Sequence, residues 1–181
     1  MDITQLILDD HYEQRRLFSI LEQIDRSDPA TLGVLWTRLA VFLELHAAAE
    51  EEIFYPALLR VGQAGAEPET LDAIHDHNDI RDAITAVPAE EAGSSRWFAA
   101  VAAVNVANGD HMAEEEREGL TDFRRLASLQ LRHDLAVAFA AFEARHYAGV
   151  PVVDKDPAAY VRAAEQQAAA GSLGIGSLKR R

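Results

Sequence analysis

The stretch that decides the fold covers residues 31–60 and reads TLGVLWTRLAVFLELHAAAEEEIFYPALLR. Its apolar residues recur every three or four positions, which is the period of a helix with one buried face. His46 and Glu50 lie on the same apolar stripe because they are four residues apart. A buried carboxylate is costly unless it is paired, protonated or bound to a metal. The stretch therefore predicts a core helix that carries a polar pair into the interior.

Three further stretches have the same period, and they cover residues 3–24, 68–87 and 96–118. Turn-forming residues separate the four helices, and we expect Gly119 to end the last of them. No stretch shows the alternating pattern of a β-strand. Short connections favour antiparallel neighbours. The predicted fold is therefore all-α, an up-down-up-down four-helix bundle with additional C-terminal helices.

The chain of 181 residues is long enough for one domain with a tail. We predict that residues 1–127 form the bundle and hold its functional site, and that residues 128–170 form accessory C-terminal helices. The second accessory helix is expected to begin at Asp156, a good N-cap residue that is followed by proline. Residues 171–181 contain three glycines and are expected to form a flexible tail.

Composition excludes several classes of function. The formal net charge of −13 argues against nucleic acid as a partner, since binding phosphates requires basic patches. The chain has no cysteine, which excludes disulfides, thiolate nucleophiles and cysteine-ligated metals. No run reaches the roughly eighteen apolar residues of a membrane span, and the N-terminus lacks the features of a signal peptide. We therefore expect a soluble, cytoplasmic protein with no membrane partner.

Six residues are candidate metal ligands, because each lies on an otherwise apolar helical stripe that we read as free of lysine and arginine: His11, His46, Glu50, His77, His111 and Glu115. Any one of these histidines alone is more often a satisfied core residue than a ligand. Two His-x-x-x-Glu pairs in alternate helices, with a core histidine in each other helix, favour a metal site. Nitrogen and oxygen ligands without sulfur suit iron, manganese or zinc. Antiparallel packing places most of them at one depth, but His111 is expected about 9 Å away from His77 along the bundle.

Several neighbours of these residues have plainer interpretations. Four carboxylates flank the candidate ligands and are expected to be solvated or to support them from behind: Glu51, Glu52, Glu114 and Glu116. His75 lies about 200° around the helix from His77 and is expected at the surface. Tyr55 lies nearly opposite Glu50 on an ideal helix, so it could approach the site only through a local bulge.

Four segments resemble the hemerythrin-like family, also called HHE cation-binding domains. They are residues 8–11 (LDDH), 46–56 (HAAAEEEIFYP), 77–81 (HNDIR) and 111–117 (HMAEEER), and the likeness covers about residues 3–125. The resemblance implies a non-haem centre of two iron ions bridged by carboxylates and by oxo or hydroxo oxygen. The four histidines would be terminal ligands and the two glutamates would bridge the ions. No catalytic residue is expected beyond these ligands.

The pattern H–HxxxE–H–HxxxE looks closest to bacterial, notably actinobacterial, hemerythrin-like proteins. Oxygen-carrying hemerythrins place two histidines four residues apart on the third helix, whereas Ala73 and Arg81 flank His77 here. The resemblance then implies an extra open position, which favours reaction with peroxide over reversible oxygen carriage. Ferritin-type bundles need two Glu-x-x-His motifs, and this chain has one, from Glu143 to His146.

The expected function is catalase-like decomposition of hydrogen peroxide in defence against oxidative stress. The alternative is sensing, binding or storage of oxygen, nitric oxide or iron without turnover. A third possibility is a bundle that only interacts with partners, and it predicts no bound metal. The expected partners are small molecules, namely hydrogen peroxide, dioxygen or nitric oxide, and the chain is expected to be a monomer or a weak homo-oligomer.

Overall fold

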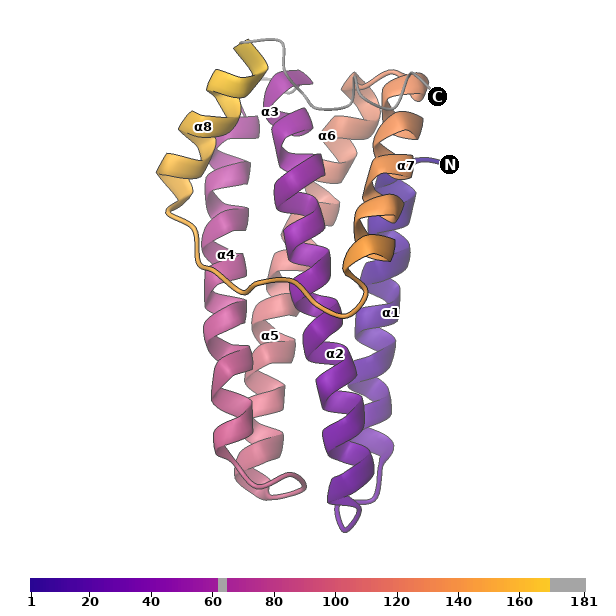
Figure 1. Cartoon of the computed structure of the whole chain (residues 1–181), viewed down its shortest axis with the longest axis vertical. Helices are drawn as coiled ribbons and strands as arrows, with labels where there is room; N and C mark the ends of the chain where they lie inside the picture. The colour runs from indigo at the N-terminus through magenta and orange to yellow at the C-terminus, as the bar shows by residue number, and fades with distance from the viewer. Residues whose placement is uncertain (62–64, 170–181) are drawn as a thin grey trace.

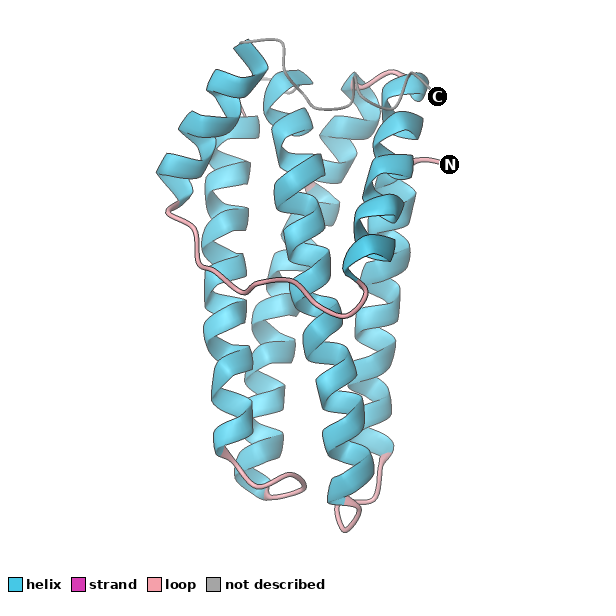
Figure 2. Ribbon diagram, viewed as in Figure 1, coloured by secondary structure: helices cyan, strands magenta, loops and turns pink. Residues whose placement is uncertain are grey.

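The computed structural model of the chain describes residues 1–61 and 65–169. Four long antiparallel helices form the bundle (Figure 1), and they are α1 (Ile3–Gln23), α2 (Pro29–Ala49), α4 (Ala66–Ala86) and α5 (Ser95–Arg117). Figure 2 shows helices and connecting loops, with no strand among the described residues, so the predicted all-α class is confirmed. The predicted tail, residues 171–181, lies outside the described residues.

The second helical column is longer than α2 because it continues without a break. A π-helix, η1 (Glu50–Phe54), follows α2 and leads directly into α3 (Tyr55–Val61). The column begins with α2, and the start of α2 is fixed by Asp28, whose side chain accepts a hydrogen bond from the backbone N–H of Thr31. The column therefore covers the predicted range 31–60, with a π-helical turn inside it.

The fourth helix ends at Arg117, next to the predicted end at Gly119, but the helix that follows it was not predicted. After a bend at Glu118, whose φ and ψ are −112° and −77°, the chain forms a further helix, α6 (Gly119–Leu126). This helix buries Leu120 and Phe123 against the core. Gly119 therefore follows the end of the fourth helix, but the apolar period resumes directly after it, and burial of Leu120 and Phe123 stabilises another helix.

Two helices follow the bundle and lie on opposite sides of it. Helix α7 (Leu129–His146) packs on α1 and α2, and α8 (Pro157–Ala169) packs on α3 and α4. The predicted N-cap is confirmed, because Asp156 accepts a hydrogen bond of 2.6 Å from the backbone N–H of Ala159. The segment between α7 and α8 crosses the face of the α2 column (Figure 1).

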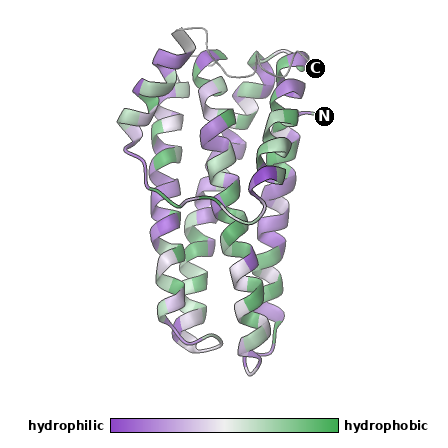
Figure 3. Cartoon of the chain, viewed as in Figure 1, coloured by the Kyte–Doolittle hydropathy of each residue, from purple (hydrophilic) through white to green (hydrophobic). Residues whose placement is uncertain are grey.

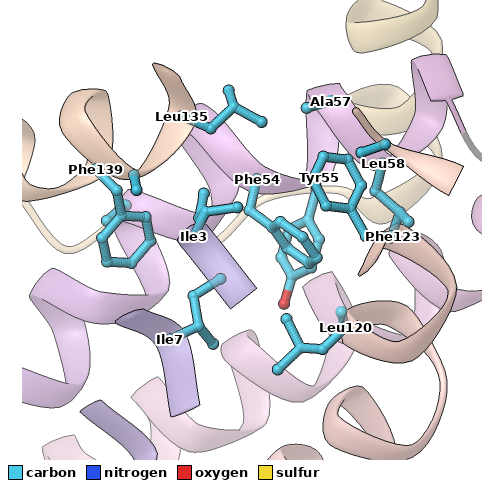
Figure 4. Packing of buried hydrophobic residues seen from close by; sticks show 14 of the residues in the cluster. Ile3, Ile7, Phe54, Tyr55, Ala57, Leu58, Leu120, Phe123, Leu135 and Phe139 are labelled. Carbon is cyan, nitrogen blue, oxygen red and sulfur yellow. The ribbon is translucent and has the colours of Figure 1, made fainter. Parts of the chain in front are cut away.

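The bundle core consists of two apolar clusters separated by a polar layer. One cluster contains Ile3, Ile7, Phe54, Phe123 and Phe139, among others (Figure 4). The other contains Leu17, Phe18, Trp36, Leu39 and Trp97, among others. Along each long helix the candidate ligands lie between residues of the two clusters. Figure 3 shows hydrophilic and hydrophobic residues mixed along the helices, as expected of amphipathic bundle elements.

The column Pro29–Val61 is long and apolar enough to span a membrane by length and composition. Half of its most apolar window is buried within the bundle, and its inner face carries His46 and Glu50. These features fit the core helix of a soluble bundle. The cytoplasmic localisation stays a prediction.

Candidate metal centre

Glu50 stands between two pairs of histidines. Its Oε1 atom lies 3.8 Å from Nε2 of His11 and 2.9 Å from Nε2 of His46. Its Oε2 atom lies 3.3 Å from Nε2 of His77 and 4.0 Å from Nε2 of His111. The carboxylate therefore belongs to two groups of three residues, in each of which the donor atoms lie within 4.8 Å of one another and could hold a metal ion.

Glu115 completes the set, since its Oε2 atom lies 3.4 Å from Nε2 of His11. The structure thus brings all six sequence-predicted residues to one buried layer. The expected offset of His111 is wrong, because its Nε2 atom lies 3.1 Å from Nε2 of His77. Helix α4 continues into a 3₁₀-helix, η2 (Val87–Ala89), so the turn lies further from His77 than Pro88 predicted.

Several of the converging atoms are buried and have no hydrogen-bond partner: Nε2 of His11 and His46, both carboxylate oxygens of Glu50 and Glu115, and the Tyr55 hydroxyl. His46 Nε2 and Glu50 Oε1 are only 2.9 Å apart, yet the two groups are not oriented to form a hydrogen bond. An unsatisfied buried polar group costs about 1–3 kcal/mol. Nitrogen and oxygen atoms that face one another without hydrogen bonds are arranged as metal ligands would be around a cation. Ligands of these two kinds suit iron, manganese or zinc.

The π-helix turns Tyr55 toward this layer. One extra residue in the turn rotates the following residues, so Tyr55 no longer lies opposite Glu50 as on an ideal helix. Its ring centroid lies 5.8 Å from that of His77, and the side chain is 1% exposed. In Figure 4 the Tyr55 oxygen points out of the apolar cluster. The local bulge that Tyr55 would need in order to approach the site is therefore present.

A carboxylate lies behind each of the four histidines. The Nδ1 atoms of His11, His46 and His77 lie 3.0, 3.0 and 2.9 Å from carboxylate oxygens of Glu116, Asp10 and Glu51, and Nδ1 of His111 lies 3.5 Å from Asp76. Such partners fix the tautomer and orientation of a histidine ligand and raise its basicity. Every Nε2 atom is thereby left to face the centre.

These pairs form a ring around the bundle, because each helix supplies the carboxylate that supports the histidine of a neighbouring helix. Helix α1 supports the histidine of α2, η1 that of α4, α4 that of α5, and α5 that of α1. Sequence reasoning left Glu51 and Glu116 open as supporting residues and missed Asp10 and Asp76. Their positions in the sequence could have identified them, since each of the four carboxylates is directly adjacent to a candidate ligand. His75 is 69% exposed, as predicted.

Glu51 is the most heavily paired of these carboxylates. Besides His77 it accepts a hydrogen bond of 2.7 Å from Arg81, and the ammonium of Lys155 lies 2.6 Å from its other oxygen. Arg81 is itself buried and also contacts Glu44. The expectation that no arginine lies on a ligand stripe is thus wrong at Arg81, which is tolerated because its charge is paired.

Burial and close charges shift the titration of this layer. Burial raises the pKa of Glu115 well above its usual value, and the neighbouring Glu50 carboxylate adds to the rise. Burial alone would raise the pKa of Glu50, but His46 lowers it well below normal. Burial lowers the pKa of His77, yet Glu50 and Glu51 raise it to about 9. Burial and the charge of His77 lower the pKa of His111 to about 4. These opposed shifts come from charged groups crowded in one dry layer.

The accessory helices reach the back of the same layer. The Phe139 ring on α7 lies edge-on to His46, with centroids 5.9 Å apart. The Tyr160 hydroxyl on α8 donates a hydrogen bond to the backbone carbonyl of Glu51 in the π-helix. Burial and then Asp10 raise the pKa of Glu143 on α7 to about 7. The C-terminal segment therefore covers the candidate centre from two sides.

A family model agrees with this geometry. The hemerythrin HHE cation-binding domain model matches residues 2–121, which span α1 to the start of α6 and contain all six candidate ligands. Searches of curated proteins and of solved structures found no significant match. Two groups of side chains that could hold a metal ion share Glu50 in the middle of the matched bundle. The chain belongs to the family of hemerythrin HHE cation-binding domains.

Proposed function

We propose that this protein holds two iron ions in a non-haem centre and uses the centre to decompose hydrogen peroxide. The observation that carries the proposal is that the buried Glu50 carboxylate, whose two oxygens have no hydrogen-bond partner, belongs to two groups of three side chains that could each hold a metal ion. The proposed terminal ligands are His11, His46, His77 and His111, and the proposed bridging ligands are Glu50 and Glu115. One glutamate whose two oxygens face different pairs of histidines is suited to bridge two cations.

Iron is favoured by the family resemblance, while the donor set by itself suits iron, manganese or zinc. Bound iron would supply the reversible electron transfer that peroxide disproportionation needs. In this reaction one peroxide is reduced to water and a second is oxidised to dioxygen, so no external reductant is required. The protein contributes placement of the donors and a pocket that excludes bulk water.

The side of the centre next to Tyr55 is where a small substrate would bind. Helix α4 offers only His77, since Ala73 has no donor and Arg81 is engaged by Glu44 and Glu51. Tyr55 and Glu115 line a cavity at this side. The Tyr55 hydroxyl has no hydrogen-bond partner, so it can donate a hydrogen bond to a small molecule that binds there.

The first test is elemental analysis of the freshly purified full chain, followed by measurement of dioxygen evolved from peroxide. We expect two irons per chain and many turnovers per centre. Protein that is metal-free and also fails to take up ferrous iron would contradict the ligand assignment. Iron-loaded protein that evolves no dioxygen would leave the metal centre in place and contradict the catalytic activity.

The second candidate function is sensing of oxygen or nitric oxide, and the contacts of the accessory helices favour it. Lys155 and Tyr160 connect the C-terminal segment directly to Glu51 beside the centre. A ligand that shifted Glu51 could therefore alter the packing of α8. Saturable ligand binding with a change in the accessory helices, and without dioxygen evolution, would support this function over peroxide decomposition.

The outer carboxylates are expected to control metal affinity. Asp10→Asn should lower the affinity about 10–100-fold, because a neutral amide orients His46 and raises its basicity less than a carboxylate does. Competition with a chelator of known affinity measures the effect. Asp9→Asn is the matched control, since Asp9 is exposed and, within the described residues, its side chain accepts a hydrogen bond only from Gln5. Equal affinities in the two variants would contradict the supporting role of Asp10.

Tyr55→Phe is expected to stabilise the metal-free protein. The variant removes a hydroxyl that is buried without a hydrogen-bond partner and leaves the ring packing intact, so the free energy of unfolding should rise by about 1–3 kcal/mol. In iron-loaded protein the same change should alter the visible absorption spectrum and slow peroxide turnover. Denaturant unfolding after chelation measures the first effect. A loss of stability in the chelated variant would show that the hydroxyl has a partner in solution.

A further inference from the structure

A cavity between α3, α4 and α5 ends at the proposed centre. Its inner wall includes Tyr55, His111 and Glu115. Tyr55 is 1% exposed and Glu115 is 7% exposed, and neither the Tyr55 hydroxyl nor the Glu115 carboxylate has a hydrogen-bond partner. The centre of a water-sized sphere can move within about 20 Å³ of this cavity, which is enough for one water molecule. The cavity thus leads to buried donors that are free to bind.

Carboxylates line the cavity from its mouth inward. Helix α4 contributes Glu69, Asp72 and Asp76, which share one face because they are three and four residues apart. Helix α5 contributes Glu114 from the facing side, and Glu118 follows at the bend between α5 and α6. Asp72 and Glu114 are exposed, while the other three are half-buried. The carboxylates therefore continue from the solvent to the buried end of the cavity.

Little positive charge opposes this acidic lining. Arg117 lies 2.9 Å from a carboxylate oxygen of Glu118 and 3.8 Å from one of Glu114, but its side chain is 63% exposed. Within the described residues no ion pair involves Glu69 or Asp72, and Glu69 Oε2 is buried without a hydrogen-bond partner. Burial, together with the charges of Asp122, Glu118 and Glu114, raises the pKa of Glu69. The lining is therefore a region of negative potential that is incompletely compensated.

We propose that this cavity is the passage through which divalent metal ions reach the centre, with Glu69, Asp72 and Glu118 as its capture residues. The inference rests on the proposed metal centre and adds the route and the residues of metal loading. Successive carboxylates give a cation oxygen partners at each depth as it loses water. A channel with one sign of charge and low-dielectric walls also concentrates ions of the opposite sign.

A cation explains the lining better than the proposed small-molecule substrates do. Hydrogen peroxide, dioxygen and nitric oxide are neutral and gain little from five carboxylates, and an anion would be repelled. A purely structural role is also disfavoured, because the carboxylates repel one another and Glu69 has an unpaired buried oxygen. The negative potential is useful only to a positively charged ligand.

The test starts from the full-length chain after its metal has been removed, and it measures the rate at which this protein takes up ferrous iron in the absence of oxygen. Uptake is stopped at set times by adding a chelator. The passage variant Glu69→Gln/Asp72→Asn/Glu118→Gln should load about 10-fold more slowly at low salt, because the electrostatic concentration of the ion is lost. Its rate should also depend less on salt than the wild-type rate, since there is less potential to screen. Its final iron content should be unchanged.

A charge-matched control separates the passage from net charge. Glu22→Gln/Asp82→Asn/Glu91→Gln removes the same formal charge from three exposed positions outside the cavity. This control should load at nearly the wild-type rate. Equal loading rates and equal salt dependence in the passage and control variants would overturn the proposal.

A second variant tests the route without changing charge. A Cβ atom at Gly119 would lie 3.7 Å from Glu115 Cγ and from Leu58 Cδ2, and 3.8 Å from Glu69 Oε2. Gly119→Leu therefore places further carbons in the cavity and should slow loading at every salt concentration. Gly109→Leu is the control, because nothing lies within 4 Å of a Cβ atom there. Unchanged loading in a folded Gly119→Leu variant would overturn the route.

The readouts keep this proposal separate from the catalytic one. Dioxygen evolution is measured per bound iron after loading is complete, and it should be equal in wild type and the passage variant. Slow loading of the passage variant with no turnover in any variant would support the passage and contradict peroxide decomposition. Fast loading of the passage variant with normal turnover would contradict the passage and support peroxide decomposition.

Discussion

Glu50→Ala is expected to abolish binding of both metal ions and, with it, peroxide turnover. One oxygen of this carboxylate lies 2.9 Å from His46 Nε2, and the other lies 3.3 Å from His77 Nε2. Removing the side chain therefore takes a donor from both halves of the proposed centre. The loss of affinity should exceed the roughly 10–100-fold expected for the outer carboxylates. Elemental analysis of the purified variant and a peroxide assay measure the two effects.

Two further variants make this prediction specific. Glu52→Ala is the control, because Glu52 is only two residues away and exposed, and it should keep both metal content and turnover. Glu115→Ala should lose iron as well, since Glu115 supplies the second buried carboxylate of the layer. Normal iron content in both the Glu50 and Glu115 variants would show that these glutamates do not hold the metal.

Metal binding is expected to stabilise the fold by about 4 kcal/mol when free metal is a thousandfold above its dissociation constant. For a chain of this size each kcal/mol raises the melting temperature by about 2–4 °C, so the loaded protein should melt about 10 °C higher. The physical reason is that four buried oxygens of Glu50 and Glu115 have no hydrogen-bond partner among the described residues. A cation would compensate this cost. Calorimetry of iron-loaded and chelated protein measures the shift.

The Glu50→Ala protein provides the control for this stabilisation. It should melt at the same temperature with and without metal, because it lacks the shared ligand. If the wild-type chain also melts at one temperature in both conditions, the polar layer does not bind metal with useful affinity. A metal-dependent rise that persists in Glu50→Ala would place the stabilising ion elsewhere in the protein.

The sequence by itself determined the four bundle helices and the inward direction of the six candidate ligands. Both follow from the helical period, because apolar residues three and four apart mark the buried face and any polar residue on that face must point inward. His46 and Glu50 could be assigned to the core for this reason. Family membership also followed from local motifs, and the family model confirms it. The metal-binding role of the six residues stays a prediction.

Local patterns missed features that depend on contacts with distant segments. The end of the fourth helix at Gly119 was predicted correctly, but α6 was missed, because its formation depends on the burial of Leu120 and Phe123 in the cluster that contains Phe54 and Phe139. Arg81 was not recognised as buried, since only the tertiary structure shows that Glu51 and Glu44 neutralise it. In both cases packing against distant segments outweighed the local preference.

Only the tertiary structure decided how the site is completed. The π-helix turns Tyr55 toward Glu115 and His77, and its Glu51 carbonyl accepts a hydrogen bond from Tyr160 on α8. The support of each histidine by a carboxylate from a neighbouring helix depends on which helices are adjacent and at what depth they meet. The helical period contains neither quantity, because it describes one helix at a time. The sequence therefore determined which residues face inward, and packing between helices determined which of them meet.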